Sequence, residues 1–151
     1  MQNRYTTICD QAMDFLALIN QSLKSAKVIE LLECHDMEVV YKFDRLFEGG
    51  SDEYQSKSVE DGFEFIFDSA QRLNTVLLYV RPREEFAAVD VSSVDVPVYA
   101  SVDAAREAFE RNGDAIKPGS GWIKGLAAGV WRHDEFHDGR LSLVTLMRNP
   151  V

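Results

Sequence analysis

The sequence predicts an α+β domain in which helices pack on one face of an antiparallel sheet. Two observations support this fold class. Strand-like segments follow one another along the chain and are separated by short turns, and a helical segment precedes each group of them. With 151 residues, of which 46% are hydrophobic and 27% charged, the chain has the size and composition of one globular domain over residues 1–151.

The amino-terminal part contains two segments with the apolar spacing of amphipathic helices. Residues 7–20 begin with Thr7 as a candidate cap and continue with apolar residues every three or four positions. A second, shorter helix is expected to start at Ser25, to bury Val28, Leu31 and Leu32, and to end near His35-Asp36.

The third predicted helix lies in the carboxyl-terminal part. Ser101 or Asp103 is its expected cap, Ala105 and Phe109 its inward side, and Gly113 its stop.

Four segments between the second and third helices have strand character, with Gly49-Gly50 as a turn. The most regular pair is expected to place Phe63, Phe65 and Phe67 under the helices. Residues 81–100 hold two prolines among charged residues and predict a connector with one edge strand. The strand segments are 38–43, 54–59, 62–68 and 73–80.

The last part of the chain predicts a hairpin. Residues 117–121 (KPGSG) are expected to form a loop, and the segment from Trp122 leads to Asp138-Gly139, both of which tolerate the positive φ of a type I′ turn. The final strand then follows from Leu141.

The two parts of the chain repeat one pattern. A helix from Ser25 and a helix from Ser101 are each followed by strands, and Arg72-Leu73 corresponds to Arg140-Leu141. This pattern predicts two degenerate helix-meander repeats, residues 22–80 and 98–148. The arrangement resembles, in shape, the small inhibitor and assembly modules typified by β-lactamase inhibitor proteins and the SmpA-type outer-membrane lipoproteins.

The formal net charge of −9 limits the classes of partner. Twenty-five acidic residues face 16 basic ones, and no run of Lys or Arg interrupts this excess. Such a surface repels phosphate groups, so we expect neither nucleic-acid nor anionic-membrane binding. A basic protein partner matches the charge better.

Residues 131–141 contain two histidines four positions apart. In a strand, His133, Glu135 and His137 would share one side, while Asp134 and Phe136 would share the other. We expect both histidines to face solvent. The alternative is a metal-binding protein or metal-dependent enzyme that uses His133, Glu135 and His137.

Cysteine content and the first residues suggest a compartment. Cys9 and Cys34 stand apart, so reduced thiols in a cytoplasm are the expectation. The first 21 residues are interrupted by Asp10 and Asp14, and we expect no secretory signal and no membrane span.

The sequence lacks the motifs of common enzyme classes. Cys34 and His35 are adjacent in sequence near a helix end, where their side chains diverge. Residues 119–125 lack both a nucleophile elbow and the GK[ST] of a phosphate loop. We therefore expect no enzyme activity and no cofactor.

An acidic, compact α+β chain of this kind also resembles the bacterial immunity proteins that neutralise polymorphic or contact-delivered toxins. The resemblance implies a cytoplasmic protein that inhibits a cognate toxin by direct binding, with a basic toxin domain as partner. Acidic side chains would meet that domain and aromatic side chains would anchor it. The candidate partner-binding residues are Asp52, Glu53, Glu84, Glu85, Tyr99, Trp122, Trp131, Asp134 and Glu135.

Overall fold

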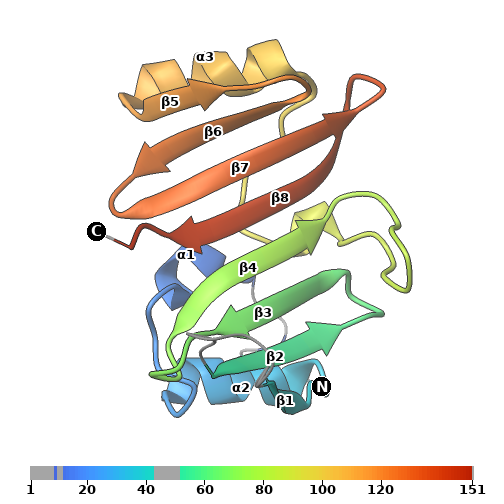
Figure 1. The fold of residues 1–151 in the computed structure, drawn as a ribbon. Coiled ribbons are helices and arrows are strands. Elements are labelled where there is room, and N and C mark those ends of the chain that lie inside the picture. The colour runs from blue at the N-terminus through green and yellow to red at the C-terminus, as the bar shows by residue number, and fades with distance from the viewer. Residues whose placement is uncertain (1–8, 10–11, 43–51, 151) are drawn as a thin grey trace, which may run out of the picture.

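The fold is an antiparallel sheet of eight strands in the order β1-β2-β3-β4-β8-β7-β6-β5 (Figure 1). The computed structural model describes the chain except residues 1–8, 10–11, 43–51 and 151. The α+β class and the antiparallel pairing are confirmed. The strands are β1 (Val39–Lys42), β2 (Glu53–Ser58), β3 (Phe63–Phe67), β4 (Leu73–Tyr79), β5 (Ala115–Pro118), β6 (Trp122–Ala127), β7 (Val130–His137) and β8 (Arg140–Arg148).

Strands β4 and β8 join the two parts of the sheet at its centre. Val76 pairs with Leu146 and Leu78 with Val144, so the last strand of each meander is hydrogen-bonded to the other. Each meander follows a helix, α2 (Ala26–Cys34) or α3 (Val102–Asn112). Figure 1 shows α2 beside the β1–β4 part and α3 beside β5 and β6.

Helices α2 and α3 have the predicted boundaries because their caps are encoded locally. The hydroxyl of Ser25 accepts a hydrogen bond from the backbone N–H of Val28, and the hydroxyl of Ser101 accepts one from Ala104. Gly113 ends α3 in the left-handed region at φ +79°.

The predicted phenylalanine face is confirmed as core. Phe63, Phe65 and Phe67 have no solvent-exposed surface. The ring of Phe15, on the short helix α1 (Phe15–Leu18), lies 5.2 Å from that of Phe63 and 5.8 Å from that of Phe65. Around α3, Phe109 packs in a second apolar cluster that includes Ile123.

The predicted helix over residues 7–20 is wrong within its described residues. Only Phe15–Leu18 is α-helical, and its cap is Asp14, whose carboxylate accepts a hydrogen bond from the backbone N–H of Ala17. Met13 instead forms a parallel bridge with Val94, and such a tertiary contact overrides helical propensity.

The predicted connector over residues 81–100 is confirmed, but its edge strand is absent. The segment contains only a 3₁₀ turn, η2 (Val91–Ser93), and isolated bridges. In the second meander, residues 117–118 of the expected loop belong to β5. The turn at Asp138-Gly139 is confirmed, with φ of +51° and +75°. The expected turn at residues 49–50 lies outside the described residues.

The expectation of reduced cysteines is wrong. Cys9 and Cys34 form a disulfide, with Cα atoms 5.3 Å apart, which ties the amino-terminal segment to the last residue of α2. Disulfides persist in oxidising compartments, so this bond argues against the expected cytoplasmic location. In the described part of the chain, no helix has the length and apolar character needed to cross a membrane.

Candidate interaction face of the sheet

Strand alternation divides the sheet side chains between two faces, and directly paired residues share a face. One continuous row crosses the sheet from Ile123 through Asp134, Val144 and Leu78 to Phe63. All five side chains are buried. This row defines the inner face, and the residues between its members point to the opposite face.

The opposite face carries an aromatic and cationic group across β5, β6 and β7, which we name the indole–lysine patch: Trp122, Trp131, Lys117 and Lys124. The ammonium of Lys117 lies 5.3 Å from the ring centre of Trp131. That of Lys124 lies 5.7 Å from Trp122 and 5.8 Å from Trp131. These distances are within the range of cation–π attraction, which holds the four side chains together.

The two lysines of the patch were not among the expected site residues. The sequence predicts a loop at Lys117, and the position of Lys124 beside both tryptophans depends on the pairing of β6 with β7. The sequence does contain one signal for Lys124: in a strand, residues 122, 124 and 126 share a face, which places Lys124 beside Trp122.

His133 lies under the edge of the patch, not in solvent as expected. Its ring centre is 5.1 Å from that of Trp122, and its Nε2 atom is buried without a hydrogen-bond partner. Burial lowers the pKa of His133, and Lys124 lowers it further, against the opposing effect of Glu135. His137 does face solvent, since 75% of its side chain is exposed.

The histidines do not form a metal site with Glu135. Among the described residues, no group of three or more His, Cys, Asp or Glu side chains is placed to hold an ion. The register shift between Glu135 and Phe136 interrupts the regular alternation on which the expected His133–Glu135–His137 row depended.

Asp134 is not a surface residue, contrary to expectation. Its side chain is completely buried on the inner face and accepts hydrogen bonds from Arg132 Nε at 2.8 Å and Nη2 at 3.1 Å. Burial raises the pKa of Asp134 and outweighs the effect of Arg132. Tyr99 is also excluded from the opposite face, because its ring lies 4.6 Å from the Arg132 guanidinium and 6.0 Å from Phe109.

The connector after β4 brings two further expected residues to the opposite face. Phe86 stacks on Tyr79 with ring centres 4.2 Å apart. Glu85 forms an ion pair of 3.3 Å with Lys57 of β2. Burial raises the pKa of Tyr79, which lies on this face, and the charge of the exposed Glu84 contributes to that rise.

The remaining expected residues divide between the face and its edge. Glu53 and Glu135 point to the opposite face, because their neighbours along the strand, Tyr54 and Asp134, belong to the inner face. Asp52 lies just before β2 and accepts a hydrogen bond of 2.8 Å from the hydroxyl of Tyr41. The structure therefore places six of the nine expected residues on this face: Glu53, Glu84, Glu85, Trp122, Trp131 and Glu135.

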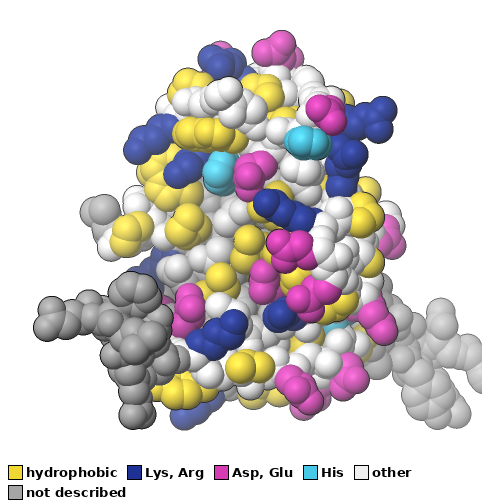
Figure 2. Space-filling view, turned by 45° about the vertical axis from the view of Figure 1, so that its right-hand side comes forward, with side chains coloured by type: hydrophobic (Ala, Val, Ile, Leu, Met, Phe, Trp, Pro, Cys, Tyr) yellow, Lys and Arg dark blue, Asp and Glu magenta, His cyan; other side chains and the backbone are white. Residues whose placement is uncertain are grey.

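Charge is unevenly distributed between the two parts of the chain. Residues 1–96 contain 18 acidic and nine basic side chains, whereas residues 97–151 contain seven of each. In Figure 2, acidic side chains are frequent in the lower part, and Lys, Arg and two histidines lie among hydrophobic side chains in the upper part. On the opposite face itself, Glu53 and Glu85 lie in the β1–β4 part, and the indole–lysine patch lies in the β5–β7 part.

A polar pocket of about 420 Å³ adjoins the patch at Trp122. Two guanidinium groups, Arg81 and Arg83, come from the connector, and Glu135 and His137 come from β7. Neither arginine was an expected site residue. They follow β4 directly, and no sequence motif links them to Trp122, which is about 40 positions later in the chain.

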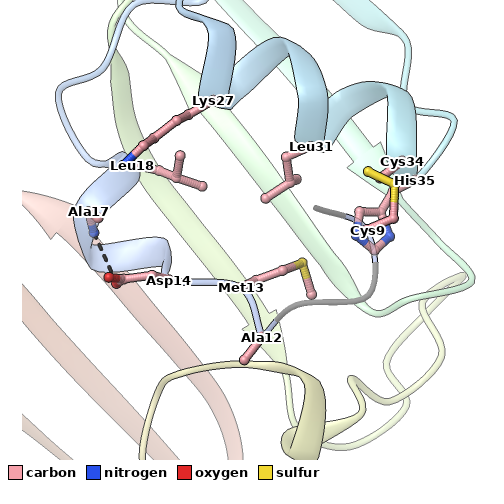
Figure 3. Close-up of a pocket in the computed structure, with 10 residues that line it drawn as sticks. All are labelled: Cys9, Ala12, Met13, Asp14, Ala17, Leu18, Lys27, Leu31, Cys34 and His35. Atoms are coloured by element: carbon pink, nitrogen blue, oxygen red, sulfur yellow. Dashed lines mark hydrogen bonds between the residues drawn. A yellow bond between two sulfur atoms is a disulfide. The ribbon is translucent and has the colours of Figure 1, made fainter. Parts of the chain in front are cut away.

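A second, mainly apolar cavity of about 200 Å³ lies between α1 and α2 (Figure 3). The Cys9–Cys34 disulfide closes one side of it, and Leu18 and Leu31 contribute to its walls. Asp14, its acidic member, already caps α1.

Comparison with known proteins found no matching family model, no matching curated protein and no matching solved structure.

Proposed function

We propose that this chain is a protein-binding module that inhibits a cognate bacterial toxin by direct binding, as immunity proteins do. The observation that carries the proposal is the grouping of Trp122, Trp131, Glu135, Glu84 and Glu85 on one face of the sheet. Binding without catalysis is the activity that such a group of aromatic and charged side chains supports.

We also infer that the helices all pack on the inner face and leave the opposite face open. Phe15 of α1 contacts Phe63 and Phe65, and Phe109 of α3 clusters with Ile123, which belong to the same face by register. The element orders α2-β1-β2-β3-β4 and α3-β5-β6-β7-β8 support the two helix-meander repeats.

The indole–lysine patch supplies the anchors of the proposed interface. Trp122 and Trp131 are half-buried, so a partner can cover the remaining surface of two large rings. Tryptophan is enriched among residues whose truncation costs at least about 2 kcal/mol of binding free energy.

The acidic region sets the charge of the partner. Glu53, Glu84 and Glu85 are on this face, and the first part of the chain carries the whole net charge of −9. Complementary charge raises the association rate and excludes acidic competitors. A toxin domain with a basic surface fits this region.

The disulfide bears on where such an inhibitor acts. The Cys9–Cys34 disulfide favours an oxidising compartment. The toxin would therefore be bound in such a compartment and not in the cytoplasm.

The test uses the protein encoded by the neighbouring reading frame, since an immunity gene lies beside its toxin gene. We expect co-expression to relieve its toxicity, and the purified pair to bind in titration calorimetry. Trp131→Ala should raise the dissociation constant by about 30-fold or more, which corresponds to the loss of about 2 kcal/mol of binding free energy.

Arg106→Ala is the matched control, because Arg106 is exposed on α3. It should leave the dissociation constant unchanged. Equal affinities of the Trp131→Ala and Arg106→Ala variants, or toxicity that persists despite co-expression, would refute the proposal.

A further inference from the structure

The polar pocket beside Trp122 contains charged groups that neither the sheet nor the indole–lysine patch requires. Arg81 and Arg83 line it from the connector, and Trp122 and Glu135, which are directly paired on β6 and β7, line it from the sheet. Its volume of about 420 Å³ is in the range of small-ligand sites.

We propose that this pocket binds a carboxylate attached to an apolar group, and that the toxin supplies this group as a side chain or chain terminus. The second part rests on the proposed function. The first part concerns the pocket alone and can be measured without any toxin.

Two guanidinium groups in one pocket favour an oxyanion ligand. A guanidinium has five N–H donors and matches a carboxylate with two parallel hydrogen bonds. Arg81 uses one donor, from Nη1 to the backbone oxygen of His137 at 3.4 Å. Arg83 is exposed, so its side chain can turn toward a ligand without unfolding an element.

The local charge favours a monoanion over a phosphate. Among the residues that line the pocket, Arg81 and Arg83 oppose the single carboxylate of Glu135, an excess of one positive charge within the lining. A carboxylate neutralises that excess. A phosphate, with up to two negative charges, would also be repelled by Glu135 and by the acidic part of the chain.

The indole of Trp122 favours a ligand whose carboxylate is attached to an apolar group. Trp122 is one of the apolar residues that line the pocket, with Phe136 and Pro82, and the ammonium of Lys124 lies 5.7 Å from the centre of its ring and adds positive potential. A flat apolar group can stack on the indole while its carboxylate reaches the arginines.

The experiment uses benzoate as the probe and the fluorescence of Trp122 as the readout. In Trp131→Phe, Trp122 is the one tryptophan left, and benzoate should change its emission in a saturable way. In Trp122→Phe, which keeps Trp131, benzoate should produce no saturable change. Benzamide, the neutral analogue, should not bind, and phenyl phosphate should bind more weakly than benzoate.

Arginine variants in the Trp131→Phe background test the assigned ligands. Arg83→Gln should weaken benzoate binding about tenfold, as expected for loss of a charge-assisted hydrogen bond. Arg106→Gln, on α3, should have no effect. Thermal unfolding of both variants checks that they are folded.

The possible results separate this inference from the proposed function. No saturable benzoate signal from Trp122, equal binding of benzamide, or tighter binding of phenyl phosphate would overturn the carboxylate assignment even if the toxin binds. If benzoate binds and Arg83→Gln leaves the toxin affinity unchanged, the toxin does not supply the carboxylate. If benzoate binds and the neighbouring protein does not, only the proposed function fails.

Discussion

Arg132 and Asp134, two residues apart on β7, form a buried ion pair on the inner face of the sheet. The guanidinium donates two hydrogen bonds to the carboxylate and a third to the backbone oxygen of Pro97. It also lies over the ring of Tyr99, 4.6 Å from its centre. The pair thus connects β7 to the segment that precedes α3.

Asp134→Leu should destabilise the protein by about 3 to 5 kcal/mol, because it leaves the Arg132 guanidinium without its carboxylate partner. The Arg132 side chain is only 13% exposed, so water cannot fully replace that partner. The double variant Arg132→Leu/Asp134→Leu should cost less than the single one, since no charge is then unpaired. Urea denaturation of the four members of this cycle measures the difference. A double variant less stable than Asp134→Leu would contradict the argument.

Protonation of His133 should make stability depend on pH. Its folded pKa lies below the ordinary value of 6.5, so the unfolded chain binds a proton more readily. The stability contributed by neutral His133 is therefore complete above about pH 6.5 and is lost as the pH falls toward the lowered folded pKa, with a slope of at most about 1.4 kcal/mol per pH unit. Urea titrations at pH 5, 6, 7 and 8 should show a shallower slope for His133→Gln. His137→Gln, at an exposed position, should keep the original slope.

Removal of the disulfide should lower the free energy of unfolding. The bond closes a loop between residues 25 positions apart, for which loop-closure entropy predicts about 3 to 4 kcal/mol. Cys9→Ala/Cys34→Ala should accordingly melt at a lower temperature than the oxidised protein. Reductant should lower the melting temperature of the original protein and leave that of the variant unchanged. An equal response of both proteins would mean that the bond is not formed in solution.

Phe65→Ala should cost about 3 to 5 kcal/mol, because Phe65 is completely buried and its ring packs against those of Phe15, Phe63 and Phe67. Glu85→Ala should change stability by less than about 0.5 kcal/mol, since its ion pair with Lys57 is solvent-exposed. Chemical denaturation distinguishes the two, and a stable Phe65→Ala protein would contradict the assigned core.

Gly139→Val should impair folding, because a β-branched residue resists the φ of +75° that Gly139 adopts in the β7–β8 turn. Gly139→Asn should be tolerated, since asparagine enters this region readily. Circular dichroism and melting temperature of both variants provide the measurement. Nothing lies within 4 Å of a Cβ built at this position, so crowding does not confuse the comparison.

Local signals predicted much of the fold. The capping serines Ser25 and Ser101, Gly113 and the Asp138-Gly139 turn act within a few residues of themselves, and each was found where the sequence placed it. The helix expected over residues 7–20 failed because a contact between Met13 and Val94, 81 positions apart, fixes that segment. Periodicity along the chain carries no information about such a contact.

The candidate site was only partly predictable. Alternation places Asp134 on the same side of the strand as Phe136 and on the other side from His133, which indicates that Asp134 faces the core. Its surface assignment followed from its charge, and burial was possible because Arg132 occupies the same face. The pairing of Trp122 with Glu135 and the approach of the connector depend on the folded sheet, and so the pocket with Arg81 and Arg83 was not visible in the sequence.

The antiparallel junction of β4 and β8 also determines what each half of the chain could do alone. If the chain were divided, residues 22–80 would expose the backbone edge of β4, and residues 98–148 would expose the backbone edge of β8. Apolar side chains that are buried in the whole protein, such as Val76 and Leu146, lie on these two strands. When two copies of one unit are related by a two-fold axis, the same edge strand of each copy pairs antiparallel with the other. Two separately produced fragments should therefore reassemble along this edge, and either fragment by itself should pair with another copy through the same strand.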